Sequence, residues 1–207
     1  MSQAAFQAAT DVSRETLQKF VIWERLLNDW SAHTNLVARS TLPDFWERHA
    51  LDSWQVFEAG PDGAARWADI GSGAGFPGLA IALGLADRGV ADAQVYLVES
   101  IGKKAAFLRE VVKETGAPAT ILCQRAETLD PALAVDVVTA RAVAALPKLL
   151  TLCDPLLKTD ATGLFLKGAR HGEELTEARK YWTFDATVIP SRTGDGAILK
   201  LKNVAHV

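Results

Sequence analysis

The sequence predicts an α/β protein with a doubly wound, mostly parallel sheet of seven strands, preceded by a helical extension and closed by an antiparallel hairpin. Three observations predict this fold class. A glycine-rich turn joins an apolar strand to a helix at 66–78, strand and helix patterns alternate from there to about residue 182, and no helix separates the last two strands. Alternation indicates parallel strands, whereas two directly joined strands form an antiparallel hairpin.

The first 60 residues carry two helical patterns. Apolar residues recur every three or four positions across about 13–31, which is the spacing of one buried helix face. A hydroxyl cap and an early proline indicate a second helix at about 40–57. Turn residues at 60–63 mark a boundary. We therefore expect a single domain over residues 1–207, in which 1–60 is a helical extension and 61–207 is the α/β core.

The α/β core alternates short apolar runs with longer amphipathic ones. Runs of four to six apolar and β-branched residues are typical of buried strands, and the longer segments between them have helical spacing. The expected strands are 66–70, 94–99, 119–123, 135–140 and 162–167, the expected helices are 77–87, 103–115, 143–156 and 171–182, and the expected hairpin strands are 184–189 and 197–203.

Composition limits the class of protein. The chain has 207 residues, of which 49% are hydrophobic and 23% charged, as in an ordinary globular protein. No stretch of about 18 apolar residues or basic leader occurs, so we expect a cytoplasmic protein with no membrane segment. Cys123 and Cys153 lack metal-binding spacing, and we expect both to be reduced, mostly buried packing residues, with no metal site. The net charge of −3 disfavours non-specific nucleic-acid binding but allows a local basic face.

The turn after the first core strand is rich in glycine. Gly71, Gly73 and Gly75 allow positive φ angles and the close approach of a ligand to main-chain N–H groups at a helix N-terminus, and Pro77 fits the first helical turn. The Gly-x-Gly-x-Gly spacing differs from the Gly-x-Gly-x-x-Gly of dinucleotide folds. We interpret the turn as a cofactor cradle, the alternative being a tight turn without a ligand.

Acidic residues lie where a ligand of such a fold would meet them. Ligands of doubly wound sheets lie beyond the carboxyl ends of the strands. Glu99 ends the second core strand, where a carboxylate can accept hydrogen bonds from two ribose hydroxyls; the alternative is a surface carboxylate. Asp69, inside the first core strand, either orients the cradle or contacts the ligand.

Residues after the third core strand are candidates for reading a base. The N–H groups of Ala126 and Glu127, together with the Glu127 carboxylate, could hydrogen-bond an adenine edge. The alternative for the side chains is a loop salt bridge between Arg125 and Glu127.

Two cations follow the fourth and fifth core strands. Arg141 faces the point where cofactor and substrate would meet, and an arginine there can bind a phosphate or the O6/N7 edge of guanine. Its alternative is a pair with a carboxylate such as Asp136. Lys167 adds a further cation at the same edge of the sheet.

A charged cluster precedes the cradle. Arg48 and Asp52 lie one helical turn apart with His49 beside them, and a histidine of this kind is more often a core or capping residue than a base. Basic side chains could also form a rim for RNA phosphates, or merely a solvated face. The candidate rim residues are Arg39, Arg48, Lys103, Lys104, Arg109, Lys148, Arg170 and His171.

Seven motifs between residues 33 and 170 resemble, in order and spacing, the bacterial RsmG (GidB) family. The Phe-Pro-Gly after the glycines and the Glu-Ser-x-x-Lys-Lys run are the most distinctive of them. A parallel sheet closed by a hairpin is also the arrangement of class I methyltransferases. The motifs are 35–37 (Asn-Leu-Val), 48–53 (Arg-His-Ala-Leu-Asp-Ser), 71–78, 99–109, 125–127, 141–142 and 166–168.

The resemblance implies an S-adenosylmethionine-dependent enzyme that methylates N7 of one guanine in 16S rRNA. Guanine N7 has a lone pair and no proton to lose, so its in-line attack needs position and electrostatics more than a general base. We hypothesise that Arg141, helped by Arg125 or Lys167, positions the guanine or its phosphate. The partner is 16S rRNA or the small ribosomal subunit, and we expect a monomer. The cofactor contacts carried over by position, with the cradle glycines, are Gly71, Gly73, Phe76, Glu99, Ala126, Glu127 and Arg141.

Three alternatives remain open at this point. A methyltransferase of the same fold could act on a small molecule or a protein, and would need no basic rim. An NAD-dependent oxidoreductase is disfavoured by the glycine spacing and the terminal hairpin. A non-catalytic cofactor-sensing protein has no feature in its favour.

Overall fold

Every strand and helix expected in the α/β core is present in the computed structural model, which describes residues 1–207. Most bounds agree with the expected ones to within a few residues. The strands are β1 (Arg66–Ile70), β2 (Gln94–Val98), β3 (Ala119–Leu122), β4 (Val137–Arg141), β5 (Thr162–Lys167), β6 (Trp182–Pro190) and β7 (Ala197–His206). The helices are α4 (Gly78–Asp87), α5 (Gly102–Thr115), a 3₁₀ turn η3 (Ala126–Thr128), α6 (Leu146–Leu157) and α7 (His171–Ala178).

The seven strands form one sheet in the order β3-β2-β1-β4-β5-β7-β6. The pairs among β1 to β5 are parallel, and β7 runs antiparallel to both β5 and β6. The doubly wound sheet with a C-terminal hairpin is therefore confirmed. The strand order reverses between β1 and β4, and the carboxyl ends of these two strands are where a doubly wound sheet places its ligand.

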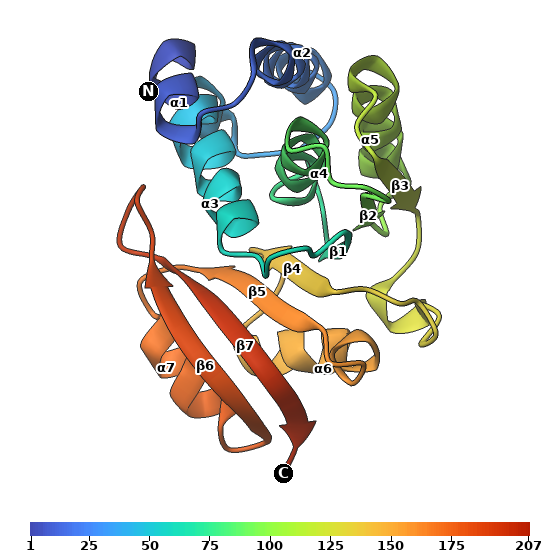
Figure 1. Cartoon of the computed structure of the whole chain (residues 1–207), viewed down its shortest axis with the longest axis vertical. Helices are drawn as coiled ribbons and strands as arrows, with labels where there is room; N and C mark the ends of the chain where they lie inside the picture. Colours follow the sequence, from blue (N-terminus) through green and yellow to red (C-terminus); the bar gives the residue numbers. More distant parts are fainter.

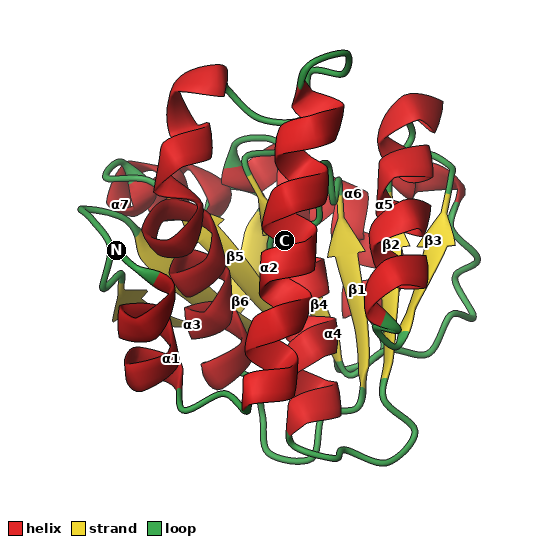
Figure 2. Ribbon diagram, turned by 90° about the horizontal axis from the view of Figure 1, so that it is seen from above, coloured by secondary structure: helices red, strands yellow, loops and turns green.

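The α-helices between residues 3 and 115 lie on one side of the sheet, and α6 and α7 lie on the other (Figures 1 and 2). Helix α4 is buried at every position from Gly78 to Leu85. A helix that is apolar all round must be covered on all sides. The sheet covers one side of α4 and the N-terminal helices cover the other.

The N-terminal extension departs from the expected two helices. It comprises α1 (Gln3–Thr10), α2 (Arg14–Ser31), the 3₁₀-helix η1 (Arg39–Asp44), the π-helix η2 (Phe45–Leu51) and α3 (Asp52–Glu58). Helix α1 was not expected, and the prediction of one continuous helix at 40–57 is wrong. Pro43 inside η1 has no N–H to donate, and the Asp52 N–H donates to the Glu47 carbonyl five residues back. The helix type therefore changes twice, from 3₁₀ to π and from π to α.

Aromatic rings hold the extension together. The Phe6 ring of α1 lies 5.0 Å from that of Phe20 and 5.4 Å from that of Trp46, with Trp54 at 6.3 Å. All four side chains are buried, and they belong to the same hydrophobic core as α4 and β2. Such ring pairs add stabilisation beyond their buried area. The extension is thus packed onto the face of the sheet that carries α4.

The two cysteines have different environments. Cys153 is buried in α6 as expected, but Cys123 is exposed, so the prediction of burial is wrong for Cys123. Cys123 follows β3, and β3 is an edge strand of the sheet, where side chains have a neighbour on one side only. None of the helices has the length and apolar character needed to cross a membrane.

Phe6→Ala should show that α1 belongs to the core. We expect the free energy of unfolding to fall by about 3–5 kcal/mol, because the substitution leaves a cavity among three aromatic rings. Urea unfolding followed by tryptophan fluorescence measures the change. Gln3→Ala, at an exposed position of the same helix, is the matched control. A loss below about 1 kcal/mol for Phe6→Ala would mean that α1 packs loosely.

Candidate active site

The seven residues between β1 and α4 form the glycine turn (Gly71–Pro77). The expected positive φ angles are present, at +68° for Gly71, +57° for Gly73 and +96° for Gly75. At Gly75 a Cβ atom would overlap the Leu79 side chain, so only glycine fits there. At Gly73 no atom lies within 3.4 Å of the position of a Cβ, which leaves this side of the turn open.

Asp69 holds the end of the glycine turn that joins α4. Its side chain is fully buried, and it accepts hydrogen bonds from the Gly78 N–H at 3.2 Å and the Thr139 hydroxyl at 2.9 Å. Burial raises the pKa of Asp69 to about 6, while these hydrogen bonds oppose the shift. Of the two roles expected for Asp69, its contacts are those of the structural one, since it ties β1 to β4 and to the start of α4.

Glu99 holds the middle of the same turn. One carboxylate oxygen accepts a hydrogen bond from the Gly73 N–H at 2.9 Å, and the other accepts one from the Ile101 N–H at 2.7 Å. The residue is 6% exposed, so the alternative of a surface carboxylate is wrong. A buried carboxylate is therefore held at the end of β2, beside the open side of the glycine turn.

A cavity next to Glu99 brings together residues that sequence reasoning proposed separately. It is lined by Gly71, Glu99, Arg125, Ala126 and Glu127, with apolar side chains from the strand ends. Arg125 and Glu127 are both exposed and form no ion pair with each other, so the loop salt bridge is not formed. The Thr128 hydroxyl instead holds this loop by donating to the Arg125 carbonyl at 2.8 Å.

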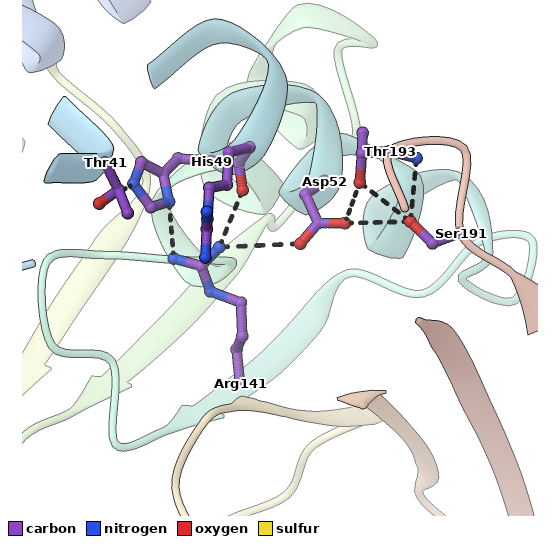
Figure 3. Close-up of polar contacts among 7 residues, drawn as sticks. Thr41, His49, Asp52, Arg141, Ser191 and Thr193 are labelled. Atoms are coloured by element: carbon purple, nitrogen blue, oxygen red, sulfur yellow. Dashed lines mark hydrogen bonds and ion pairs between the residues drawn. The ribbon is translucent and has the colours of Figure 1, made fainter. Parts of the chain in front are cut away.

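Arg141 ends β4 and points into a cluster from the N-terminal extension (Figure 3). Its guanidinium donates to the Arg48 carbonyl at 3.3 Å and to the His49 ring at 3.2 Å, and it lies 3.7 Å from the Asp52 carboxylate. It also stacks on the Phe76 ring, with its central carbon 4.8 Å from the ring centre. Burial lowers the pKa of Arg141, and the neighbouring Asp52 raises it.

The alternative given for Arg141, a pair with a carboxylate, is present, but the example of Asp136 was wrong. Asp136 lies at the opposite end of the sheet, where it pairs with Arg66 at 3.0 Å, so it cannot reach Arg141. Asp52 takes that place.

His49 is a buried core histidine, as the sequence favoured. Arginine only donates, so the nitrogen facing Arg141 must accept, and the other ring nitrogen carries the proton. That second nitrogen lies 3.0 Å from the Thr41 hydroxyl, which itself donates to the Ala38 carbonyl. Burial, followed by the charges of Arg141 and Arg48, lowers the pKa of His49 to about 4. The ring is neutral at physiological pH and stacks on Phe76 at 4.7 Å.

Phe76 forms the base of this cluster. Its ring is 3% exposed and stacks on Trp23 at 4.4 Å as well as on His49. Phe76 lines a cavity of about 520 Å³ that also exposes Gly73 and Arg141. Its proposed contact with a cofactor stays a prediction.

Lys167 lies at the same edge of the sheet but is already paired. Its ammonium group is 2.7 Å from the Glu174 carboxylate and donates to the Ala144 carbonyl at 2.6 Å. Its side chain is 7% exposed. Lys167 lines a third cavity, of about 560 Å³, to which Arg141 also belongs. Its proposed part in positioning a substrate stays a prediction.

The expected basic rim is spread over several elements. Arg48 and Lys104 line the cavity beside Gly73 and Arg141. Lys103, Arg109 and the remaining candidates lie outside the cavities around Arg141, and most are exposed.

Sequence reasoning predicted the hairpin but missed the contact of the β6–β7 loop with the site. Ser191 and Thr193 lie between the two expected hairpin strands, and their hydroxyls lie 3.4 and 2.8 Å from one Asp52 carboxylate oxygen. The separation of 141 residues between Asp52 and Thr193 leaves no local sequence signal for this contact.

Solved structures share the fold of this chain. A structure from Listeria monocytogenes described as a class I S-adenosylmethionine-dependent methyltransferase has a TM-score of 0.63 and covers 91% of this chain and 68% of its own, at 12% identity. Together with the strand order and the glycine turn, this likeness defines a class I methyltransferase fold.

The family follows from more similar sequences. The family model of rRNA small subunit methyltransferase G (GidB) matches residues 16–194. The relatives of that name from Rhodospirillum centenum and Parvibaculum lavamentivorans are 50% and 46% identical to this chain. Each alignment covers 97% of this chain, with 90% and 88% of the respective relative. The chain belongs to the rRNA small subunit methyltransferase G family, as its motifs had indicated.

The neutral state of His49 should make stability depend on pH. The pKa is about 4 in the folded protein and 6.5 in the unfolded chain, so the unfolded chain binds the proton more readily. The free energy of unfolding should therefore fall as the pH drops from about 6.5 to 4, by about 3 kcal/mol in all.

Urea unfolding of the wild type and of His49→Gln between pH 7.5 and 4.5 isolates this contribution. Gln keeps an acceptor for Arg141 but does not titrate, and the opposing contribution of Asp69 is common to both proteins. The two stability curves should diverge below pH 6.5. Parallel curves would contradict the neutral assignment.

Proposed function

We propose that this protein transfers a methyl group from S-adenosylmethionine to N7 of a guanine in 16S rRNA. The observation that carries the proposal is the placement of the buried Glu99 beside the glycine turn and of the partly buried Arg141 across it, in a chain of this family. An acid for a ribose and a cation for the acceptor base thus line two cavities that share Gly71 as a lining residue.

The residues around Glu99 fit the nucleoside of such a cofactor. An ionised carboxylate offers about four acceptor positions, and the Gly73 and Ile101 N–H groups use two of them. Two remain for the hydroxyls of a ribose. The N–H groups of Ala126 and Glu127 donate to no acceptor in the protein and are available to an adenine edge.

When bound, S-adenosylmethionine supplies a methyl group activated by a positively charged sulfur. The protein's contribution is to hold the guanine so that its N7 lone pair is aligned with that methyl group. No side chain needs to remove a proton. A neutral His49 is compatible with this chemistry, because it serves as an acceptor for Arg141 rather than as a base.

Arg141 is the group that holds the acceptor nucleotide. A guanidinium has five N–H donors, and Arg141 uses two of them on the Arg48 carbonyl and the His49 ring. The remaining donors can bind guanine O6 or a phosphate. N7 itself must stay free of a hydrogen bond in the reactive complex, because a donor there would occupy the lone pair that attacks.

Arg125 and Lys167 have subordinate roles. Arg125 is exposed on the rim of the cavity beside Glu99, where it can contact an RNA phosphate. Lys167 acts through Glu174, whose carboxylate also accepts from the Leu146 N–H at the start of α6. It therefore keeps α6 and α7 in place beside the acceptor.

The proposed partner is 16S rRNA or the small ribosomal subunit, which places the protein in the cytoplasm. The exposed Arg48 and the partly exposed Lys104 border the cavity beside Arg141, and they can approach the phosphates that flank the target guanine. We propose that the protein acts as a monomer.

Replacement of Glu99 should weaken cofactor binding. We expect Glu99→Gln to raise the Kd for S-adenosylmethionine about tenfold, because an amide keeps one acceptor oxygen and loses the charge. Glu99→Ala should lose more. Titration calorimetry measures both, with Glu110→Gln, at a partly exposed position on α5, as the control. Equal affinity of the wild type and Glu99→Ala would remove the ribose assignment.

Replacement of Arg141 should abolish efficient methylation. We expect Arg141→Ala to lower kcat/KM by about two orders of magnitude, because the acceptor loses its electrostatic anchor. Transfer of labelled methyl groups to small subunits from cells lacking this protein measures the rate, and cleavage at N7-methylguanine locates the product. Arg25→Ala, exposed on α2, is the control. Wild-type methylation by Arg141→Ala under subsaturating substrate would refute the role.

A further inference from the structure

The β6–β7 loop (Ser191–Gly196) lies against helix α3 of the N-terminal extension. The side chains that receive it are spaced three residues apart, so they share one face of α3. At least 134 residues of sequence separate each partner from the loop. The attachments are Thr193 to Asp52 at 2.8 Å, the Arg192 N–H to Gln55 at 2.7 Å, and the Arg192 guanidinium to Glu58 at 2.5 Å.

Asp52 faces the loop with one oxygen and Arg141 with the other (Figure 3). The first oxygen accepts from the Thr193 hydroxyl and lies 3.4 Å from the Ser191 hydroxyl. The second lies 3.7 Å from the Arg141 guanidinium, which is within ion-pair range but too long for a hydrogen bond. Asp52 thus stabilises the charge of Arg141 without using any of its donors.

The distance of 3.7 Å matters because arginine and carboxylate groups prefer a closer arrangement. A carboxylate that moved about 1 Å nearer would form a charge-assisted hydrogen bond to the guanidinium. Such a bond would occupy a donor that Arg141 does not use on Arg48 or His49. The Thr193 hydroxyl, itself 2.9 Å from Ser191, holds the carboxylate back on the loop side.

We propose that Thr193 is a positioning residue for methyl transfer. Its hydroxyl anchors Asp52 at a distance that leaves the donors of Arg141 free for the acceptor nucleotide. This inference rests on the proposed function for the role of Arg141. The loop also lines the cavity of about 560 Å³ beside Arg141, so the anchored segment is a wall of the site itself.

Thr193→Val tests the proposal, because it replaces the hydroxyl by a methyl group of similar size. We expect kcat/KM for the small subunit to fall about tenfold, while the Kd for S-adenosylmethionine stays within twofold of the wild type. Thr193→Ser should restore most of the activity. Thr187→Val, at an exposed position of β6 without side-chain hydrogen bonds, is the matched control. Unchanged kcat/KM in a folded Thr193→Val protein would overturn the proposal.

A double-mutant cycle separates positioning from general loop stability. Asp52→Asn keeps the shape of the side chain but removes the charge that would capture Arg141. Thr193→Val should therefore add little further loss in the Asp52→Asn background. Additive losses would mean that the loop acts without Asp52, and the proposal would be wrong.

A readout without catalysis keeps the inference distinct from the proposed function. In the ligand-free protein, the side-chain N–H signal of ¹⁵N-labelled Arg141 should shift and exchange more slowly with water in Thr193→Val than in the wild type or Thr187→Val. A wild type that methylates no rRNA would refute the proposed function and leave this measurement valid. An unchanged Arg141 signal would refute the inference alone.

Discussion

The partial burial of Arg141 at the end of β4, with its side chain 19% exposed, is the constraint on which the site depends. Removing a charge from water costs several kcal/mol unless hydrogen bonds and an opposite charge offset it. The offset comes from the Arg48 carbonyl, the His49 ring and the Asp52 carboxylate, and from the face of Phe76. The first three belong to one short stretch of the N-terminal extension. The extension is therefore part of the site and not an addition to a complete α/β core.

Two buried carboxylates hold the glycine turn from opposite sides. Asp69 bonds the Gly78 N–H at the start of α4, and Glu99 bonds the Gly73 N–H in the turn itself. Main-chain donors that would otherwise lie unpaired are thereby satisfied, and the turn keeps its shape without a ligand. A preformed turn lowers the conformational entropy that the protein must lose when a ligand binds. The same carboxylate of Glu99 retains acceptor positions for that ligand.

The departures from the sequence-based predictions have local physical causes. Helix α1 has only eight residues, and its stability comes from the packing of Phe6 on rings that follow much later in the chain. Over a few residues, the apolar spacing of the π-helix η2 does not differ from that of an α-helix. The wider winding that presents His49 and Asp52 to Arg141 therefore has no signature in the sequence. Cys123 is exposed because it follows β3, which is an edge strand of the sheet.

The sequence by itself determined the order of strands and helices along the α/β core, the glycine turn, and the residues at the strand ends. Periodicity, turn chemistry and motif spacing are local properties, and they placed Glu99, Arg125 and Arg141 at one edge of the sheet. The tertiary structure alone decided which partners these residues have. Arg141 pairs with Asp52 and not with Asp136, and Lys167 is held by Glu174. Thr193 meets Asp52 across 141 residues. Such contacts depend on how the extension and the hairpin pack on the sheet, which no local pattern encodes.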